Sequence, residues 1–161
     1  MKLSDTFKVT TPGDLEIVMA RDFDAPPDII FDALTKPEFV QRWLLGPDGW
    51  IMPVCEIDLK VGGAWRFVWR NEENGREIGM HGEYREIVRP EHIVHTEIFG
   101  EGESLVTSSI TAKGETATLI MTMRFDSRAE RAAALETGMA DGVAVGYDRL
   151  DEMLASTGSR K

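Results

Sequence analysis

The chain has 161 residues, of which 42% are hydrophobic and 29% are charged, a composition typical of one globular domain. Its 18 basic and 28 acidic residues give a net charge of −10, and such a surface repels phosphate backbones, which argues against nucleic acid as a partner. The one cysteine, Cys55, can form neither an internal disulfide nor a multi-thiolate metal site. No stretch approaches about 18 uninterrupted apolar residues, so we expect no membrane insertion and, by default, a cytoplasmic location.

The sequence predicts a single domain over residues 14–156. We expect residues 1–13 to form a flexible arm that ends in a Pro-Gly turn, and residues 157–161 to form a disordered tail. Apolar residues alternate with other residues from 15 to 23, which predicts the first strand of the domain.

Two short helices are predicted to follow this strand. The first comes after Pro26, where Asp24 is placed to cap it and proline is tolerated in the first turn. The second begins near Pro37, and Thr35 and Glu38 have the spacing of a capping box at its start.

Six further strands are predicted as consecutive hairpins, which favours an antiparallel sheet. Gly62 and Gly63 form a two-residue hairpin signal between the first two of these strands. The predicted strands cover residues 51–61, 64–70, 77–88, 92–99, 103–112 and 115–125.

The hydrophobic period changes to that of a helix in the last segment, which predicts one long amphipathic helix over residues 127–155. Ser127 has capping-box spacing at its start. Gly138, Gly142 and Gly146 recur every four residues and share one side of this helix, where each costs up to about 1 kcal/mol relative to alanine. We expect them to allow close approach of the sheet or a partner molecule, or to leave room for a ligand. The predicted fold is therefore α+β: a curved antiparallel sheet around a long C-terminal helix, with two short helices after the first strand.

Ten segments between residues 21 and 150 carry a further signal through their order. They are residues 21–27, 30–33, 35–38, 42–47, 61–67, 82–84, 90–94, 137–139, 142 and 148–150. In this order they resemble the activator of heat-shock protein 90 ATPase homologue family, part of the START-like (SRPBCC) superfamily with its helix-grip fold.

The resemblance implies the fold more directly than an activity, because one fold hosts many functions. Relatives include a co-chaperone domain, a self-sacrificing antibiotic-resistance protein and many bacterial single-domain proteins. Members of the superfamily bind lipids, hormones and polyketides, and some are cyclases. We find no counterpart of the extra N-terminal domain of the eukaryotic co-chaperone, which argues against co-chaperone activity.

Aromatic residues and methionines predict an apolar pocket between the sheet and the last helix. Rigid aromatic rings with flexible methionines suit varied apolar ligands, and the resemblance supports this interpretation over ordinary core packing. The loop from Gly46 to Trp50 is expected near the mouth of the pocket. The candidate ligand-binding residues are Trp43, Trp50, Trp65, Phe67, Trp69, Met80, Tyr84, Met121, Met123, Met139, Gly142, Val143 and Tyr147.

A His/Glu set offers the other candidate chemistry. If the strands around residue 90 pair about Pro90, then His81, Glu83, His95 and Glu97 share one face of the sheet, where they could bind zinc or transfer protons. The opposite face is the more apolar one and should form the core. We therefore expect all four side chains to be solvent-exposed and to bind no metal.

No catalytic residue or cofactor is predicted, because the sequence contains no nucleophile elbow, phosphate loop or dinucleotide fingerprint. The sequence favours non-catalytic binding of a small apolar molecule and leaves a homodimer open. Two alternatives remain: a cyclase- or aromatase-like enzyme for a polyketide-type substrate, and a chaperone-cofactor-like interaction module. An inward-facing polar pair among the aromatic residues would favour the enzyme. A sealed interior would favour the interaction module, and an open apolar cavity would favour the binding protein.

Overall fold

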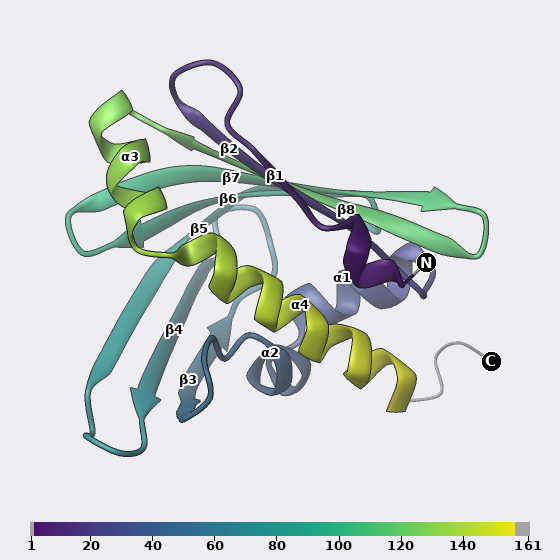
Figure 1. Ribbon diagram of the computed structural model, residues 1–161, viewed down its shortest axis with the longest axis horizontal. Coiled ribbons are helices and arrows are strands. Elements are labelled where there is room, and N and C mark those ends of the chain that lie inside the picture. Colours follow the sequence, from purple (N-terminus) through teal and green to yellow (C-terminus); the bar gives the residue numbers. More distant parts are fainter. Residues whose placement is uncertain (1, 157–161) are drawn as a thin grey trace.

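The computed structural model describes residues 2–156. The elements in chain order are η1 (Leu3–Thr6), β1 (Lys8–Thr10), β2 (Glu16–Phe23), α1 (Pro27–Thr35), α2 (Pro37–Trp43), β3 (Trp50–Ile57), β4 (Ala64–Asn71), β5 (Glu77–Val88), β6 (His92–Phe99), β7 (Gly102–Lys113), β8 (Thr116–Phe125), α3 (Arg128–Glu136) and α4 (Met139–Ser156). All eight strands form one antiparallel sheet in the order β1-β2-β8-β7-β6-β5-β4-β3, which curves over α4 (Figure 1). The predicted fold class is confirmed.

The strands follow the alternation of side chains in the sequence. In β4, Trp65 and Phe67 are buried while Arg66 and Arg70 on the other face are exposed, as expected for a period of two. The predicted two-residue turn at Gly62-Gly63 is wrong, because β3 already ends at Ile57 and a loop over residues 58–63 joins it to β4.

The predicted arm contains regular structure. Within residues 1–13 lie the 3₁₀ turn η1 and the short strand β1, and β1 extends the sheet by pairing with β2 through Val9 and Met19. The predicted tail at 157–161 lies outside the described residues.

The two short helices lie where they were predicted, but their caps differ. Pro26 is the N-cap of α1 and Lys36 that of α2, and neither helix has a side-chain cap hydrogen bond. The hydroxyl of Thr35 instead donates to the carbonyl of Phe31 at 2.8 Å, so the expected capping box does not form. Proline in the first turn, which needs no amide donor there, fixes both starts.

The predicted single C-terminal helix is wrong, because it is divided into α3 and α4. The Thr137 and Gly138 amides donate back to carbonyls of α3, and Gly138 adopts a φ of +78°, which ends that helix. Gly138 is therefore a helix terminator and lies on no shared side with Gly142. The predicted cap at the start of α3 is confirmed, since Ser127 Oγ accepts a hydrogen bond from the Glu130 amide at 3.1 Å.

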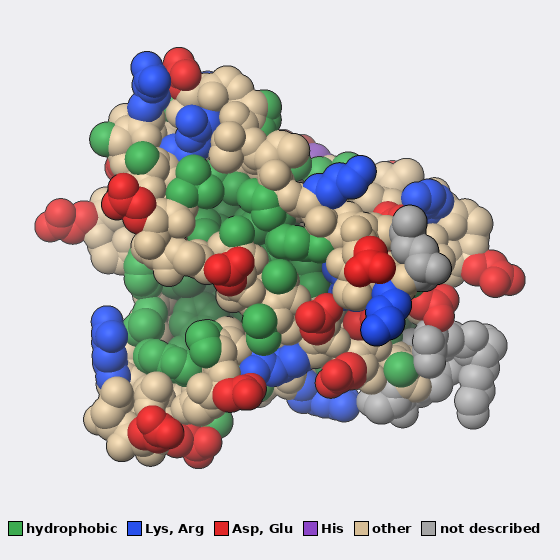
Figure 2. All heavy atoms as spheres, viewed as in Figure 1, with side chains coloured by type: hydrophobic (Ala, Val, Ile, Leu, Met, Phe, Trp, Pro, Cys, Tyr) green, Lys and Arg blue, Asp and Glu red, His purple; other side chains and the backbone are tan. Residues whose placement is uncertain are grey.

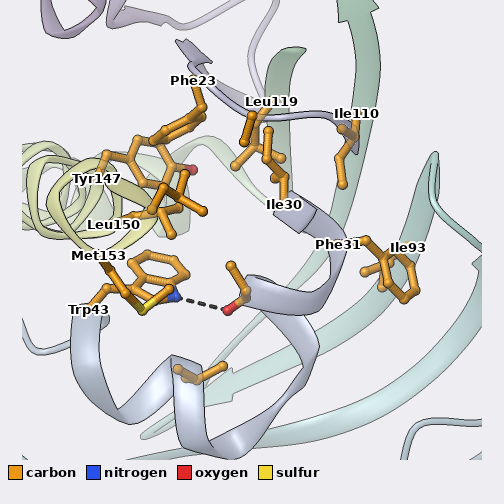
Figure 3. Close-up of a cluster of buried hydrophobic side chains, with 14 of the residues drawn as sticks. Phe23, Ile30, Phe31, Trp43, Ile93, Ile110, Leu119, Tyr147, Leu150 and Met153 are labelled. Atoms are coloured by element: carbon orange, nitrogen blue, oxygen red, sulfur yellow. Dashed lines mark hydrogen bonds between the residues drawn. The ribbon is translucent and has the colours of Figure 1, made fainter. Parts of the chain in front are cut away.

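The main core lies between the concave face of the sheet and the helices α1, α2 and α4 (Figure 3). The Trp43 ring lies against Tyr147 of α4, and its indole N–H donates to the Ala33 carbonyl at 2.8 Å. A second cluster contains Ile17, Met19, Val106, Met123 and Phe125 of β2, β7 and β8. Val143 of α4 packs against both clusters, so the helix joins them.

Candidate ligand-binding site

The floor of the candidate site is the concave face of β4 and β5. Trp65, Phe67 and Trp69 of β4 are the register partners of Gly82, Met80 and Ile78 of β5, and directly paired residues lie on the same face of a sheet. Trp65 and Phe67 are buried, whereas Trp69 and Met80 are only half-buried although they pack against the core. The floor thus becomes more open from Trp65 toward Trp69.

The opposite wall is formed by α4. Two glycines of α4 show how closely it approaches α2. A Cβ added at Gly146 would lie 3.4 Å from the Trp43 carbonyl oxygen, whereas a Cβ added at Gly142 would have no neighbouring atom within 4 Å. The helix therefore touches α2 at Gly146 and stands free of it one turn earlier. Val143 and Met139 beside this opening are half-buried.

Between these walls the surface is hollowed. Figure 2 shows hydrophobic side chains gathered in a hollow between α4 and the β3–β4 edge of the sheet. We call this hollow the α4 groove and assign to it the half-buried apolar side chains that pack against the two core clusters from both sides. They are Leu44, Leu45, Trp69, Met80, Met139 and Val143. Met121 lies on β8, beside the second cluster and away from this edge of the sheet.

The residues proposed from the sequence divide into two groups. Those buried almost completely within the core are Trp43, Trp65, Phe67, Tyr84, Met123 and Tyr147. Those left half-buried are Trp50, Trp69, Met80, Met121, Met139, Gly142 and Val143. Trp50 belongs to neither core cluster. Five of the half-buried residues, all except Trp50 and Met121, thus remain candidates for direct ligand contact, while the buried ones belong to the core clusters.

The loop after α2 is fixed to both walls. Arg149 of α4 donates to the Gly46 carbonyl and, at 2.9 Å, to the Asp48 carboxylate. The indole N–H of Trp69 donates to the Leu44 carbonyl at 2.7 Å. These bonds hold residues 44–48 between α4 and β4, beside the groove.

The prediction for the His/Glu set is wrong for two of its four members. His81 and Glu83 are exposed, but His95 and Glu97 are half-buried, with side-chain exposures of 19% and 20%. The reason is a register shift between Tyr84 and Glu86 in the pairing of β5 with β6. It makes His95 the partner of Tyr84, and one residue of slip moves a side chain to the other face.

His95 and Glu97 therefore lie on the concave face. The His95 ring contacts Trp65 edge-on at 5.4 Å between centroids and Tyr84 at 6.0 Å, and its Nε2 lies 3.9 Å from Glu97 Oε2. Its Nδ1 is buried and has no hydrogen-bond partner. A buried donor without a partner is costly, so we assign a ring proton to Nε2, on the side of Glu97, rather than to Nδ1.

Three further polar side chains near the core lose their protons only well above neutral pH. Burial raises the pKa of the Cys55 thiol to about 11 and also raises the pKa values of the Tyr84 and Tyr147 hydroxyls. All three therefore stay protonated. Among residues 2–156, no group of three or more His, Cys, Asp or Glu side chains is arranged to hold a metal ion.

Two surface depressions lie away from these residues. One, of about 620 Å³, is beside the turn at residues 12–16, and one of about 470 Å³ is beside Pro90 and Ile110. Neither depression is lined by any of the ligand-binding residues predicted from the sequence. In the described part of the chain, no helix has both the length and the apolar character needed to span a bilayer.

A curved antiparallel sheet that grips a C-terminal helix, with an apolar groove between them, defines a START-like domain. The family described as Activator of Hsp90 ATPase homolog 1-like protein matches residues 24–155, and the chain belongs to this family. No curated protein matches the sequence.

Several solved structures are similar to this chain. A protein from Rhodobacter sphaeroides is 28% identical with a TM-score of 0.87, covering 93% of this chain and 98% of its own. One from Chromobacterium violaceum is 25% identical with a TM-score of 0.75, covering 86% and 96%. An HSP90 activator from Plasmodium falciparum is 24% identical with a TM-score of 0.51, covering 69% and 73%.

Proposed function

We propose that this protein binds a small apolar molecule in the α4 groove without turning it over. The observation that carries the proposal is the set of half-buried apolar side chains on facing walls, above all Trp69 and Met80 on the sheet and Met139 and Val143 on α4. A folded protein ordinarily buries such residues, and a groove of rigid rings and flexible methionines suits apolar ligands.

Methionine methyl groups provide a direct test of this proposal. Met80 and Met139 are half-buried in the groove, whereas Met52, Met123 and Met153 are buried in the core. We expect 4-methylbiphenyl, an apolar probe, to shift the NMR signals of the first two methyl groups much more than those of the last three. Equal shifts in both sets, or no saturable shift at all, would contradict the proposal.

Gly142 allows the groove to be filled without disturbing the core. A leucine at this position extends into space that is empty within 4 Å of Cβ, so Gly142→Leu should keep the fold and abolish binding of 4-methylbiphenyl. Gly142→Ala is the matched control and should bind normally. Native mass spectrometry of the freshly purified protein would then show whether a molecule co-purifies with it and is lost in Gly142→Leu.

A second candidate function is catalysis of the cyclase or aromatase kind on a polyketide-type substrate. The inward-facing pair of His95 and Glu97 among the aromatic rings favours it. The co-purifying molecule separates the two functions, because a binding protein releases it unchanged after incubation and an enzyme converts it.

The family description also makes an interaction with a chaperone a candidate, as an alternative to the small molecule. For the binding protein we also propose a cytoplasmic location and a homodimer.

A further inference from the structure

The pair formed by His95 and Glu97 lies where the two core clusters meet on the floor of the sheet. His95 contacts Trp65 and Tyr84 of the main cluster and is the register partner of Val106 in the second cluster. Val143, which packs against both clusters, comes from the opposite wall. The pair therefore brings a carboxylate and an imidazole to the concave face, where the buried Ser104 of β7 is the register partner of Glu97.

The two side chains are close but do not satisfy one another. The distance of 3.9 Å between His95 Nε2 and Glu97 Oε2 exceeds that of a hydrogen bond. Among residues 2–156, the Glu97 carboxylate has no hydrogen-bond partner and no ion-pair partner besides His95. A half-buried carboxylate normally has a hydrogen-bond donor, because its desolvation is costly.

The distance between His95 Nε2 and Glu97 Oε2 allows one oxygen atom to bridge the two side chains. An oxygen atom about 2.8 Å from each of two groups can bridge them when they are less than about 5.6 Å apart, and 3.9 Å meets that condition. With its proton on Nε2, His95 donates to that oxygen, while Glu97 accepts from it. Only a group that is both acceptor and donor fits, and a hydroxyl is the simplest such group.

We propose that His95 and Glu97 form a polar subsite that selects apolar ligands carrying a hydroxyl group, such as a phenol or an alicyclic alcohol. The proposal rests on the binding function proposed above. The T-shaped contacts of His95 with Trp65 and Tyr84 hold the imidazole in place before the ligand arrives, so little side-chain entropy is lost on binding. The apolar part of the ligand lies in the α4 groove and its hydroxyl bridges the pair.

The test compares 4-hydroxybiphenyl with 4-methylbiphenyl, which differ only in the group that would meet the pair. Without a polar partner the hydroxyl compound should bind more weakly, because it loses its hydrogen bonds to water. With the pair in place we expect it to bind about tenfold more tightly. Dissociation constants come from titration of the methionine methyl signals.

Matched variants assign the preference to the pair. His95→Phe and Glu97→Leu remove the ring donor and the carboxylate acceptor, and should each reduce the preference to about twofold or less, with little change in binding of the methyl compound. His81→Phe and Glu83→Leu are the controls, because the same two residue types are exposed on the other face of the neighbouring strand. These should keep the full preference.

Each outcome has a distinct meaning. If both compounds bind equally well, or if the preference survives in His95→Phe and Glu97→Leu, the polar subsite is wrong while groove binding stands. If neither compound binds to the wild-type protein, the binding function and the subsite fail together. Thermal unfolding of each variant shows whether a loss of binding is a loss of fold, and the variant that stays folded gives the deciding value if the other does not.

Discussion

The Arg21 guanidinium donates a 2.6 Å hydrogen bond to the backbone carbonyl of Tyr147, and thereby ties the first long strand to the middle of the C-terminal helix. Arg21 lies on the concave face of β2 and is 2% exposed. Its second amino group reaches Asp151 at 3.3 Å, and its guanidinium carbon lies 4.7 Å from the centre of the Phe23 ring. This contact fixes the position of α4 over the sheet, and with it one wall of the groove.

Arg21→Lys should lower the free energy of unfolding by about 1–3 kcal/mol, because a compact ammonium cannot replace the two-pronged guanidinium and remains buried. Asp151→Asn should cost less than about 0.5 kcal/mol, since that carboxylate is 38% exposed and its ion pair is screened. Urea unfolding measures both values. Equal costs for the two variants would mean that the ion pair, and not the bond to Tyr147, carries the contact.

The strands were predicted well from the sequence, but the side chains of β6 were assigned to the wrong faces of the sheet. Alternation in β4 marks Trp65 and Phe67 as inward residues directly, because a regular strand has a period of two. The inward position of His95 depends on the register shift after Tyr84, where the inward residues of β5 change from Tyr84 to Ile87 with no glycine or proline to mark the bulge. Spacing alone did group His95 with Glu97, but the shift hid the fact that both residues lie on the concave face.

The helix break was missed for a different reason. A glycine four residues before another glycine fits a helical stripe as well as it fits a terminator, and only the backbone conformation at Gly138 distinguishes the two. Arg21 was also missed, although it lies on the same parity as Ile17 and Met19. A charged residue on the apolar face of a predicted strand is a signal that could have identified this buried contact.

Gly138 and Gly142 should respond to alanine in opposite directions. Gly138→Ala should destabilise the protein by about 1–2 kcal/mol, because alanine is strained at a positive φ. Gly142→Ala should stabilise it by up to about 1 kcal/mol, because this residue lies within α4 and an added Cβ meets nothing. Chemical unfolding of both variants checks the signs, and stabilisation by both would indicate one continuous helix in solution.

The stability of the protein should depend on Asp22 at acid pH. The Thr118 hydroxyl donates to this carboxylate at 2.6 Å and Lys113 donates at 3.0 Å, and these contacts lower the pKa of Asp22 below its usual value. Because the folded-state pKa is depressed, the contribution is complete above the unfolded-state pKa of about 3.9 and is lost as the pH falls through the folded-state value.

Asp22→Asn should therefore reduce stability by about 1–3 kcal/mol at pH 7, and this deficit should shrink as the pH falls below 4. Thr118→Val removes the largest cause of the pKa shift and should weaken the pH dependence while leaving Lys113 in place. Unfolding curves at pH 7, 4 and 3 measure the change. A deficit for Asp22→Asn that is independent of pH would show that the carboxylate charge is not involved.

Gly82 and Gly79 offer a matched pair on β5 that tests how the aromatic floor is held. A Cβ at Gly82 would lie 1.9 Å from the Thr96 carbonyl oxygen and 2.7 Å from Trp65 Nε1, the two atoms joined by the 3.0 Å hydrogen bond that fixes the Trp65 ring. A Cβ at Gly79 would make only ordinary contacts, with the Phe67 carbonyl oxygen at 3.7 Å the closest of them.

Gly82→Ala should cost about 2–4 kcal/mol, because it combines overpacking with loss of the bond from Trp65 to Thr96, whereas Gly79→Ala should stay within about 0.5 kcal/mol of the wild type. The Trp65 indole proton gives a local measurement: its exchange with solvent should be slow in the wild type and in Gly79→Ala, and fast in Gly82→Ala. Because the Trp65 ring holds His95 edge-on, Gly82→Ala should also weaken the preference for 4-hydroxybiphenyl in any protein that remains folded. Unchanged exchange and stability in Gly82→Ala would mean that β5 and β6 move apart without cost, and that Trp65 does not need Gly82 to reach Thr96.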